Sequence, residues 1–254
     1  MHNLKLYKEN PSIFQRYIAL TNQKQILIDK VYKKIIENNI SKKISLLDIG
    51  CADGMVTDKI IDKLRQLYQL EVTGIETSKK LINQFKSRTD YDINFINDNV
   101  ESMDRLPKSD FILLAHVVSY IDNLEKFIDK VINSLNSKGI ALIVVSNDYS
   151  DDKKVKNSLK GQKIEDTIST SASVKSILSK KKVKYDVEVV ESEIDVSGIE
   201  DMNENGKTII EFLKHKKNED ISPDEIDDIR NKILNIANEN KTIIKREDYI
   251  WIMN

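Results

Sequence analysis

The sequence predicts an α/β protein whose core is a doubly wound, mostly parallel sheet of about seven strands. Short apolar runs alternate along the chain with segments whose apolar residues recur at helical spacing, which is the pattern of consecutive βαβ units. The first apolar run ends directly in a glycine-rich turn, as in folds that bind a ligand at the carboxyl edge of a parallel sheet. N-terminal helices and a helical insertion before the last strand complete the predicted Rossmann-like architecture.

The first half of the chain is expected to supply most of the sheet. Residues 13–40 predict one or two N-terminal helices, because apolar side chains recur there and neither proline nor glycine occurs between Pro11 and residue 40. Strands and helices then alternate. The strands are expected at residues 44–49, 71–76, 93–96, 110–115 and 140–146, and the helices at residues 56–70, 79–86 and 124–135.

The second half of the chain is expected to finish the sheet. Residues 147–163 are polar and rich in lysine and aspartate, which predicts a loop or lid. A short helix at 171–178 precedes a long strand at 185–196 that begins an antiparallel edge. The Ser222–Glu225 segment has a capping serine, a proline and a glutamate, and so predicts a helix start. Residues 249–253 are expected to form the last strand.

Composition and length favour one soluble domain. The chain has 254 residues, and 40 basic against 41 acidic side chains give a formal net charge of -1, which attracts neither nucleic acid nor an anionic membrane. One cysteine excludes an internal disulfide, and no run approaches the roughly 18 apolar residues of a membrane span. We expect a cytoplasmic monomer without a signal peptide, a metal, a nucleic-acid partner or a membrane partner. Its single domain (1–254) would comprise a helical cap (1–43), a binding core (44–146) and a C-terminal half (147–254).

Three predicted strand ends carry residues that suit one nucleoside. The turn Gly50–Gly54 follows the first strand, and its small residues let the backbone approach a ligand closely. Glu76 ends the second strand, where an acid can accept hydrogen bonds from both hydroxyls of a ribose. Asp98 or Asn99 follows the third strand and is placed to contact an adenine amino group. A tight turn or a helix-start acid would explain each feature alone, but the three together indicate a nucleoside site.

The spacing of the turn favours methyl transfer over hydride transfer. A nicotinamide dehydrogenase has the fingerprint G-x-G-x-x-G, whereas here Gly50 and Gly54 are separated by three residues and preceded by Asp48. With Ala52, these residues resemble the first motif of class I S-adenosylmethionine-dependent methyltransferases, and the resemblance covers roughly residues 44–146. It implies S-adenosylmethionine as the cofactor. The implied cofactor residues are Asp48, Gly50, Cys51, Ala52, Gly54, Glu76, Thr77, Asp98, Asn99, Ser102 and Ala115.

A closer resemblance lies outside this core. Residues 195–206 and 212–213 look like the histamine N-methyltransferase family, in which the acceptor amine lies among the N-terminal helices, the fourth strand end and the C-terminal region. The sequence departs from that family where the acceptor binds. Gln23 stands in place of a glutamate, His116 in place of a glutamine and Lys245 in place of an asparagine. The resemblance therefore implies the fold and the cofactor, but not histamine.

The acceptor residues predict a small-molecule methyltransferase that acts at an amine nitrogen. His116 follows the fourth strand and is placed to orient or deprotonate an acceptor, although a histidine there is more often a packing residue. Tyr120 is a candidate wall of the acceptor pocket, and plain core packing is an equal alternative. Tyr7, Phe14 and Tyr17 suit either an aromatic lid over a small cation or the buried face of a helix. The candidate acceptor residues are Tyr17, Gln23, His116, Tyr120 and Lys245.

Other classes of function stay open at this point. A catalytically silent S-adenosylmethionine-binding module would bind the cofactor without turnover of an acceptor, and a nicotinamide-dependent oxidoreductase would bind a dinucleotide instead. A nucleic-acid methyltransferase is disfavoured because residues 116–120 replace the Asn/Asp-Pro-Pro-aromatic run of that class. We interpret Cys51 as a small buried side chain rather than a nucleophile. The lysines at 180–182 are interpreted as a solvated turn.

Overall fold

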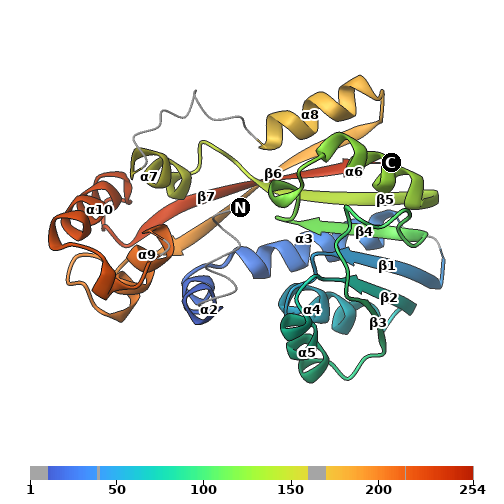
Figure 1. Cartoon of the computed structure of the whole chain (residues 1–254), viewed down its shortest axis with the longest axis horizontal. Helices are drawn as coiled ribbons and strands as arrows, with labels where there is room; N and C mark the ends of the chain where they lie inside the picture. Colours follow the sequence, from blue (N-terminus) through green and yellow to red (C-terminus); the bar gives the residue numbers. More distant parts are fainter. Residues whose placement is uncertain (1–10, 39–40, 160–169, 215, 254) are drawn as a thin grey trace. The chain divides into compact units, whose positions relative to one another are not determined.

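The predicted sheet is present in a computed structural model of the chain, which describes residues 11–38, 41–159, 170–214 and 216–253 (Figure 1). Seven strands form one sheet in the order β3-β2-β1-β4-β5-β7-β6. Strands β1 and β2, β2 and β3, β1 and β4, and β4 and β5 pair in parallel. The doubly wound, mostly parallel fold is therefore confirmed. The strands are β1 (Lys43–Ile49), β2 (Gln69–Ile75), β3 (Ile93–Ile96), β4 (Ser109–Ala115), β5 (Leu135–Ser146), β6 (Tyr185–Asp195) and β7 (Ile243–Met253).

Helices flank the sheet and precede most of its strands, as the periodicity of the sequence predicts. The helix start at residue 222 is confirmed, because Ser222 Oγ accepts a hydrogen bond from Glu225 N at 3.3 Å and Glu225 Oε2 accepts one from Ser222 N at 3.2 Å. The α-helices are α2 (Pro11–Ala19), α3 (Gln23–Asn38), α4 (Met55–Leu64), α5 (Lys79–Arg88), α6 (Leu124–Ser134), α7 (Asp151–Leu159), α8 (Thr170–Lys180), α9 (Glu204–Lys214) and α10 (Pro223–Ile236). The 3-10 helices within the described residues are η1 (Val118–Tyr120) and η3 (Asn218–Asp220).

The prediction of a loop over residues 147–163 is wrong for its central part, which forms α7, while residues 160–163 lie outside the described residues. The two aspartates in the first turn of α7 are favourable there, because a helix N-terminus attracts negative charge. Val155 is 2% exposed and belongs to an apolar cluster with residues far away in the sequence. The helix is therefore stabilised by tertiary burial that a polar composition does not reveal.

Three element boundaries also differ from the prediction. Helix α4 ends at Leu64 rather than at residue 70, and Leu67, which continues the helical spacing, is 56% exposed. Leu70 belongs to β2 instead. Strand β5 begins at Leu135, where the sequence predicts the end of a helix, and β7 begins at Ile243 rather than at residue 249. The extra length of β7 brings Lys245 and the residues after it into the sheet.

The described chain divides into two compact units, each with its own apolar core. The sheet unit comprises residues 25–145, 170–189 and 249–253, and its core includes Leu47, Ile112 and Phe127. The insertion unit comprises residues 11–24, 146–159 and 190–248, and its core includes Ile194 and Ile229. Among the described helices, none combines the length and the apolar character that a bilayer crossing requires.

Candidate cofactor and acceptor sites

The turn after β1 belongs to the sheet unit and requires glycine at two positions. Gly50 N donates a hydrogen bond to Ile75 O at 2.8 Å, which ties the turn to the end of β2. Gly50 and Gly54 have φ of 75° and 76°, a region that suits glycine. A Cβ on Gly54 would lie 2.1 Å from the ring of Phe85, and one on Gly50 would lie 2.8 Å from Val117 Cγ2. The packing of the chain therefore demands both glycines, in addition to the ligand approach inferred from the sequence.

Asp48, the acid before the turn, is buried and links β1 to α4. Its Oδ2 accepts a hydrogen bond from Thr57 Oγ1 in the first turn of α4. Burial raises the pKa of Asp48 to about 7, the bond from Thr57 acts in the opposite direction, and the negative charge of Glu76 adds to the rise. Asp48 therefore connects the end of β1 to the start of α4, on either side of the turn, and has a pKa near neutral pH.

The Glu76 carboxylate lies at the end of β2, across from the turn. Oε2 accepts a hydrogen bond from Ala52 N at 3.2 Å, and Oε1 accepts bonds from Ser78 N at 2.8 Å and Thr77 Oγ1 at 3.2 Å. Asn97 Nδ2 donates to the carbonyl oxygens of Glu76 and Thr77, both at 2.9 Å. These contacts orient the carboxylate beside the turn, where its remaining lone pairs can accept hydrogen bonds from a diol.

Residues 97–103 after β3 carry the third set of polar groups. We call them the adenine loop after their predicted ligand. Asp98 Oδ1 accepts a hydrogen bond from Asn99 N at 2.7 Å and lies 3.1 Å from Ser102 Oγ. Asn99 Oδ1 accepts a bond from Glu101 N at 3.0 Å. Both side chains are exposed, and within the described chain Oδ2 of Asp98 accepts no hydrogen bond. That oxygen is therefore available to a ligand.

The sheet order brings these groups to one edge, which we call the cofactor edge. Strands β3, β2 and β1 are consecutive neighbours and run in parallel, so the adenine loop, Glu76 and the turn follow three adjacent strand ends. Strand β4 lies on the other side of β1, where Asp48 pairs with Leu113. Ala115, two residues beyond Leu113, therefore ends β4 beside the turn. The predicted cofactor residues thus come together on one edge of the sheet.

His116 and Tyr120 also belong to the sheet unit and follow the end of β4. His116 is half-buried, has a φ of 58° and donates its backbone N–H to Val144 O at 3.0 Å. The left-handed region is uncommon for a residue other than glycine and recurs at functional sites. Tyr120 is half-buried at the end of η1 and donates its backbone N–H to Val117 O at 2.9 Å. Both predicted acceptor residues therefore follow a strand that borders the cofactor edge.

Tyr17 and Gln23 are buried in the insertion unit, which is described by itself. The ring of Tyr17 stacks on Phe212 with a centroid distance of 3.6 Å and an interplanar angle of 10°. Gln23 Nε2 donates a hydrogen bond to Asp248 Oδ2 at 2.5 Å. Of the other proposed lid aromatics, Tyr7 lies outside the described residues, as does the side chain of Phe14.

Lys245, also in the insertion unit, has an exposed side chain. The side chain is 68% exposed, and its ammonium lies 3.9 Å from Glu191 Oε2. Its backbone N–H donates to Asp151 Oδ2 at 2.9 Å. The ammonium of Lys245 therefore lies on the surface beside a carboxylate.

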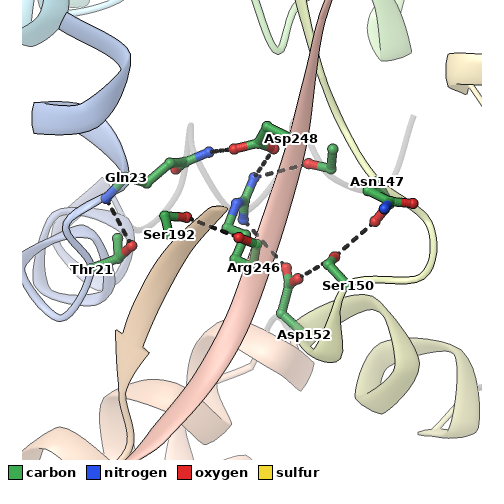
Figure 2. A network of polar contacts seen from close by, with 9 residues as sticks. Thr21, Gln23, Asn147, Ser150, Asp152, Ser192, Arg246 and Asp248 are labelled. Carbon is green, nitrogen blue, oxygen red and sulfur yellow. Dashed lines mark hydrogen bonds and ion pairs between the residues drawn. The ribbon is translucent and has the colours of Figure 1, made fainter. Parts of the chain in front are cut away.

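The buried cation of β7 is Arg246, which sequence reasoning did not identify. Figure 2 shows its guanidinium between two carboxylates: Nη1 lies 3.3 Å from Asp152 Oδ2, and Nη2 lies 3.4 Å from Asp248 Oδ1. The three side chains are 11%, 3% and 4% exposed, and Ser150 Oγ donates to Asp152 Oδ1 at 2.7 Å. Burial raises the pKa of Asp152, but the positive charges of Arg246 and Lys156 hold it below its usual value. Alternation along a strand that begins at residue 243 would have distinguished Arg246 from its exposed neighbour.

Two further predictions concern Cys51 and the lysines at 180–182. Cys51 is buried and free, and burial raises the pKa of its thiol, so it is not a nucleophile at neutral pH. The lysine run is more than a solvated turn, because Lys180 Nζ lies 2.9 Å from Glu125 Oε1 and Lys181 Nζ lies 2.7 Å from Asp129 Oδ1. These surface ion pairs connect α8 to α6.

The segment that carries most of the cofactor edge is similar to known proteins. Residues 47–141 match the family described as methyltransferase domain. A curated relative, the ubiquinone biosynthesis O-methyltransferase of Rickettsia typhi, is 25% identical over 126 residues, which are 48% of this chain and 48% of the relative. The chain thus spans about half the length of the curated relatives that it matches.

Solved structures with the same fold include the YcgJ protein from Bacillus subtilis, with a TM-score of 0.57 and 17% identity over 89% of this chain and 96% of that chain. The plantazolicin methyltransferase BpumL, in complex with a pentazolic desmethylPZN analog and SAH, gives a TM-score of 0.56 at 15% identity. That likeness covers 97% of this chain and 92% of BpumL. At these identities the similarity demonstrates the fold.

Proposed function

We propose that this chain, whose residues 47–141 match a methyltransferase-domain family, transfers a methyl group from S-adenosylmethionine to a small molecule. The observation that carries the proposal is the convergence of the glycine turn, the oriented Glu76 carboxylate and the adenine loop on three adjacent strand ends. The curated relatives are named as methyltransferases, and BpumL, which shares the fold, holds SAH. Both facts support the same cofactor here.

The residues of the cofactor edge fit S-adenosylmethionine. Glu76 would accept hydrogen bonds from the ribose hydroxyls, and Oδ2 of Asp98 would accept one from the adenine amino group. The remaining cofactor-edge residues of this proposal would line the nucleoside and the methionine part. They are Asp48, Gly50, Cys51, Ala52, Gly54, Thr77, Asn99, Ser102 and Ala115. When bound, the sulfonium of the cofactor supplies a methyl group that is already activated for displacement.

The residues of the chain then have to align the acceptor and exclude water. In this proposal His116, which has a left-handed conformation after β4, would accept a proton from the nucleophilic atom of the acceptor. Tyr120 at the end of η1 would form a wall of the same pocket. Tyr17, Gln23 and the exposed Lys245 remain proposed acceptor residues.

The acceptor atom is the finer part of the proposal. The sequence resemblance suggests an amine nitrogen, but no comparison supports the histamine N-methyltransferase family, and the Rickettsia relatives are named as O-methyltransferases. A hydroxyl loses its proton as its oxygen is methylated, and an amine loses a proton either from its ammonium form before methylation or from the product nitrogen afterwards, so a proton acceptor such as His116 suits either. We therefore propose a small molecule with a nucleophilic oxygen or nitrogen.

The proposal is tested first by binding and then by turnover. Calorimetry on the full chain should show binding of S-adenosylmethionine and S-adenosylhomocysteine with micromolar or better affinity. No binding of either ligand, together with a clear response to a nicotinamide dinucleotide, would refute the proposal. Release of S-adenosylhomocysteine is then followed with phenols, catechols and amines, each with and without a carboxylate. Tight binding of the cofactor with no turnover across this panel would favour the silent binding module.

A further inference from the structure

Lys130 on α6 is attached to the adenine loop by three hydrogen bonds. Its ammonium donates to the carbonyl oxygens of Val100 at 2.9 Å, Glu101 at 2.8 Å and Met103 at 2.6 Å. An ammonium has three N–H donors and no acceptor, so one loop satisfies every donor that Lys130 has. Within the described chain no carboxylate forms an ion pair with Lys130, and the hydrogen bonds of its ammonium are all with the loop.

A second connection of opposite charge ties the same loop to the start of α6. Glu101 Oε1 accepts hydrogen bonds from Asp122 N and Asn123 N, both at 3.1 Å. Asn123 is the N-cap of α6, and its own side chain accepts a bond from Lys126 N. The adenine loop is therefore tied to the start of α6 by its own carboxylate, Glu101, and to a later turn of the helix by the ammonium of Lys130.

The loop needs such support, because its ligand-facing part lies on the surface. Val100 and Met103 pack in or against the core of the sheet unit, whereas Asp98 and Asn99 are exposed. Backbone bends and turns, rather than a strand or helix, connect these residues. Charge-assisted hydrogen bonds are stronger than neutral ones, so the three bonds from Lys130 add to the core packing of Val100 and Met103 and fix the main chain that follows Asp98 and Asn99.

We propose that Lys130 is a positioning residue for the adenine loop: it holds Asp98 and Asn99 in the geometry that recognises the amino group of adenine. This inference rests on the proposed function, since it assigns Lys130 to the same cofactor edge. Lys130 does not touch the cofactor. It sets both the affinity for the nucleoside and the preference for an amino group over an oxygen at the corresponding ring position.

The test compares Lys130→Met with Lys126→Met, which changes an exposed lysine one turn earlier on the same helix. Calorimetry measures the dissociation constants of S-adenosylhomocysteine and of its inosine analogue, which carries an oxygen in place of the amino group. We expect Lys130→Met to bind S-adenosylhomocysteine about tenfold more weakly. The same variant should bind the inosine analogue with nearly unchanged affinity, so the preference for the amino group falls. Lys126→Met should match the wild type in both.

Three outcomes are distinguishable. An unchanged preference in Lys130→Met, measured at a temperature where the variant is folded, would overturn the positioning role, even if its melting temperature had fallen. A wild type that binds neither nucleoside would overturn the proposed function, and this inference with it. Hydrogen exchange of the ligand-free chain gives an independent readout. Amides of residues 98–103 should exchange faster in Lys130→Met than in Lys126→Met, and equal rates would contradict the attachment of the loop by Lys130.

Discussion

Replacing Arg246 with methionine should strongly destabilise the insertion unit. Methionine keeps much of the length of the side chain but leaves two carboxylates, Asp152 and Asp248, buried without their cation. Both are less than 5% exposed, so solvent does not compensate for the lost partner. Removal of one partner from a buried ion pair costs about 3 to 5 kcal/mol of folding free energy. For a chain of this length, that loss lowers the melting temperature by about 6 to 20 °C.

The neighbouring Lys245→Met provides the matched control. It also removes a positive charge from β7, but the side chain is 68% exposed and 3.9 Å from its partner, so the free energy of unfolding should change by less than about 0.5 kcal/mol. Thermal and urea unfolding of both variants are followed by circular dichroism at pH 7. Equal stabilities of Arg246→Met and Lys245→Met would refute the view that Arg246 compensates buried charge.

The same cluster predicts a dependence of stability on pH. Arg246 and Lys156 hold the pKa of folded Asp152 below its usual value, so the unfolded chain binds the proton more readily. The stabilisation is complete above the unfolded pKa of about 4 and is lost as the pH falls through the folded pKa. The difference in stability between Arg246→Met and the wild type should therefore shrink below about pH 4. An unchanged difference at pH 3 would indicate that Asp152 is not responsible.

Two further predictions concern the cofactor edge. Glu76→Ala should weaken binding of S-adenosylhomocysteine by about 1 to 3 kcal/mol, because the ribose hydroxyls lose an acceptor. Glu71→Ala, which removes an exposed acid from β2, should leave calorimetric binding unchanged; equal losses would contradict the ribose role. Asp48→Asn should remove a pH dependence of stability. Burial raises the pKa of folded Asp48 to about 7, so wild-type stability should fall as the pH rises from about 4 to 7, and a parallel decline in Asp48→Asn would disprove this origin.

Local sequence patterns were sufficient for the cofactor edge. A strand that runs into Gly50, an acid at the end of the next strand and polar residues after the third are all readable within a few positions of each strand. Parallel βαβ units then bring consecutive strand ends to one edge, because their crossovers are short and share one hand. The sequence does not show that packing also requires glycine at positions 50 and 54, because the side chains that a Cβ would meet there are Val117 and Phe85, which are distant in sequence.

Other interactions depend on residues that are distant in sequence. Lys130 lies 27 to 30 positions from the residues whose carbonyl oxygens it binds. Neither the periodicity nor the composition of the sequence indicates that this lysine contacts that loop. Helix α7 likewise forms from a polar segment because Val155 and Asp152 are buried among remote residues. In both cases the stabilising partner is supplied by the tertiary structure.

The sequence by itself determined the class of fold, the strand ends that carry the proposed nucleoside residues and the helix start at Ser222, because each depends on hydrogen bonds or periodicities that extend over a few residues. Only the tertiary structure decided which residues of β7 are buried. Successive side chains of a strand alternate between its two faces, so the adjacent residues Lys245 and Arg246 differ in exposure, at 68% and 11%. The sequence does not determine which of the two faces the interior, because that depends on the register of the strand. Arg246 pairs with Asp152, which is 94 positions away, and with Asp248. Asp248 in turn accepts a hydrogen bond from Gln23, which is 225 positions from Asp248 in the sequence. The charges of Arg246, Asp152 and Asp248 are brought together only in the folded chain. They are buried together because burial of any one of them without its partners is strongly unfavourable.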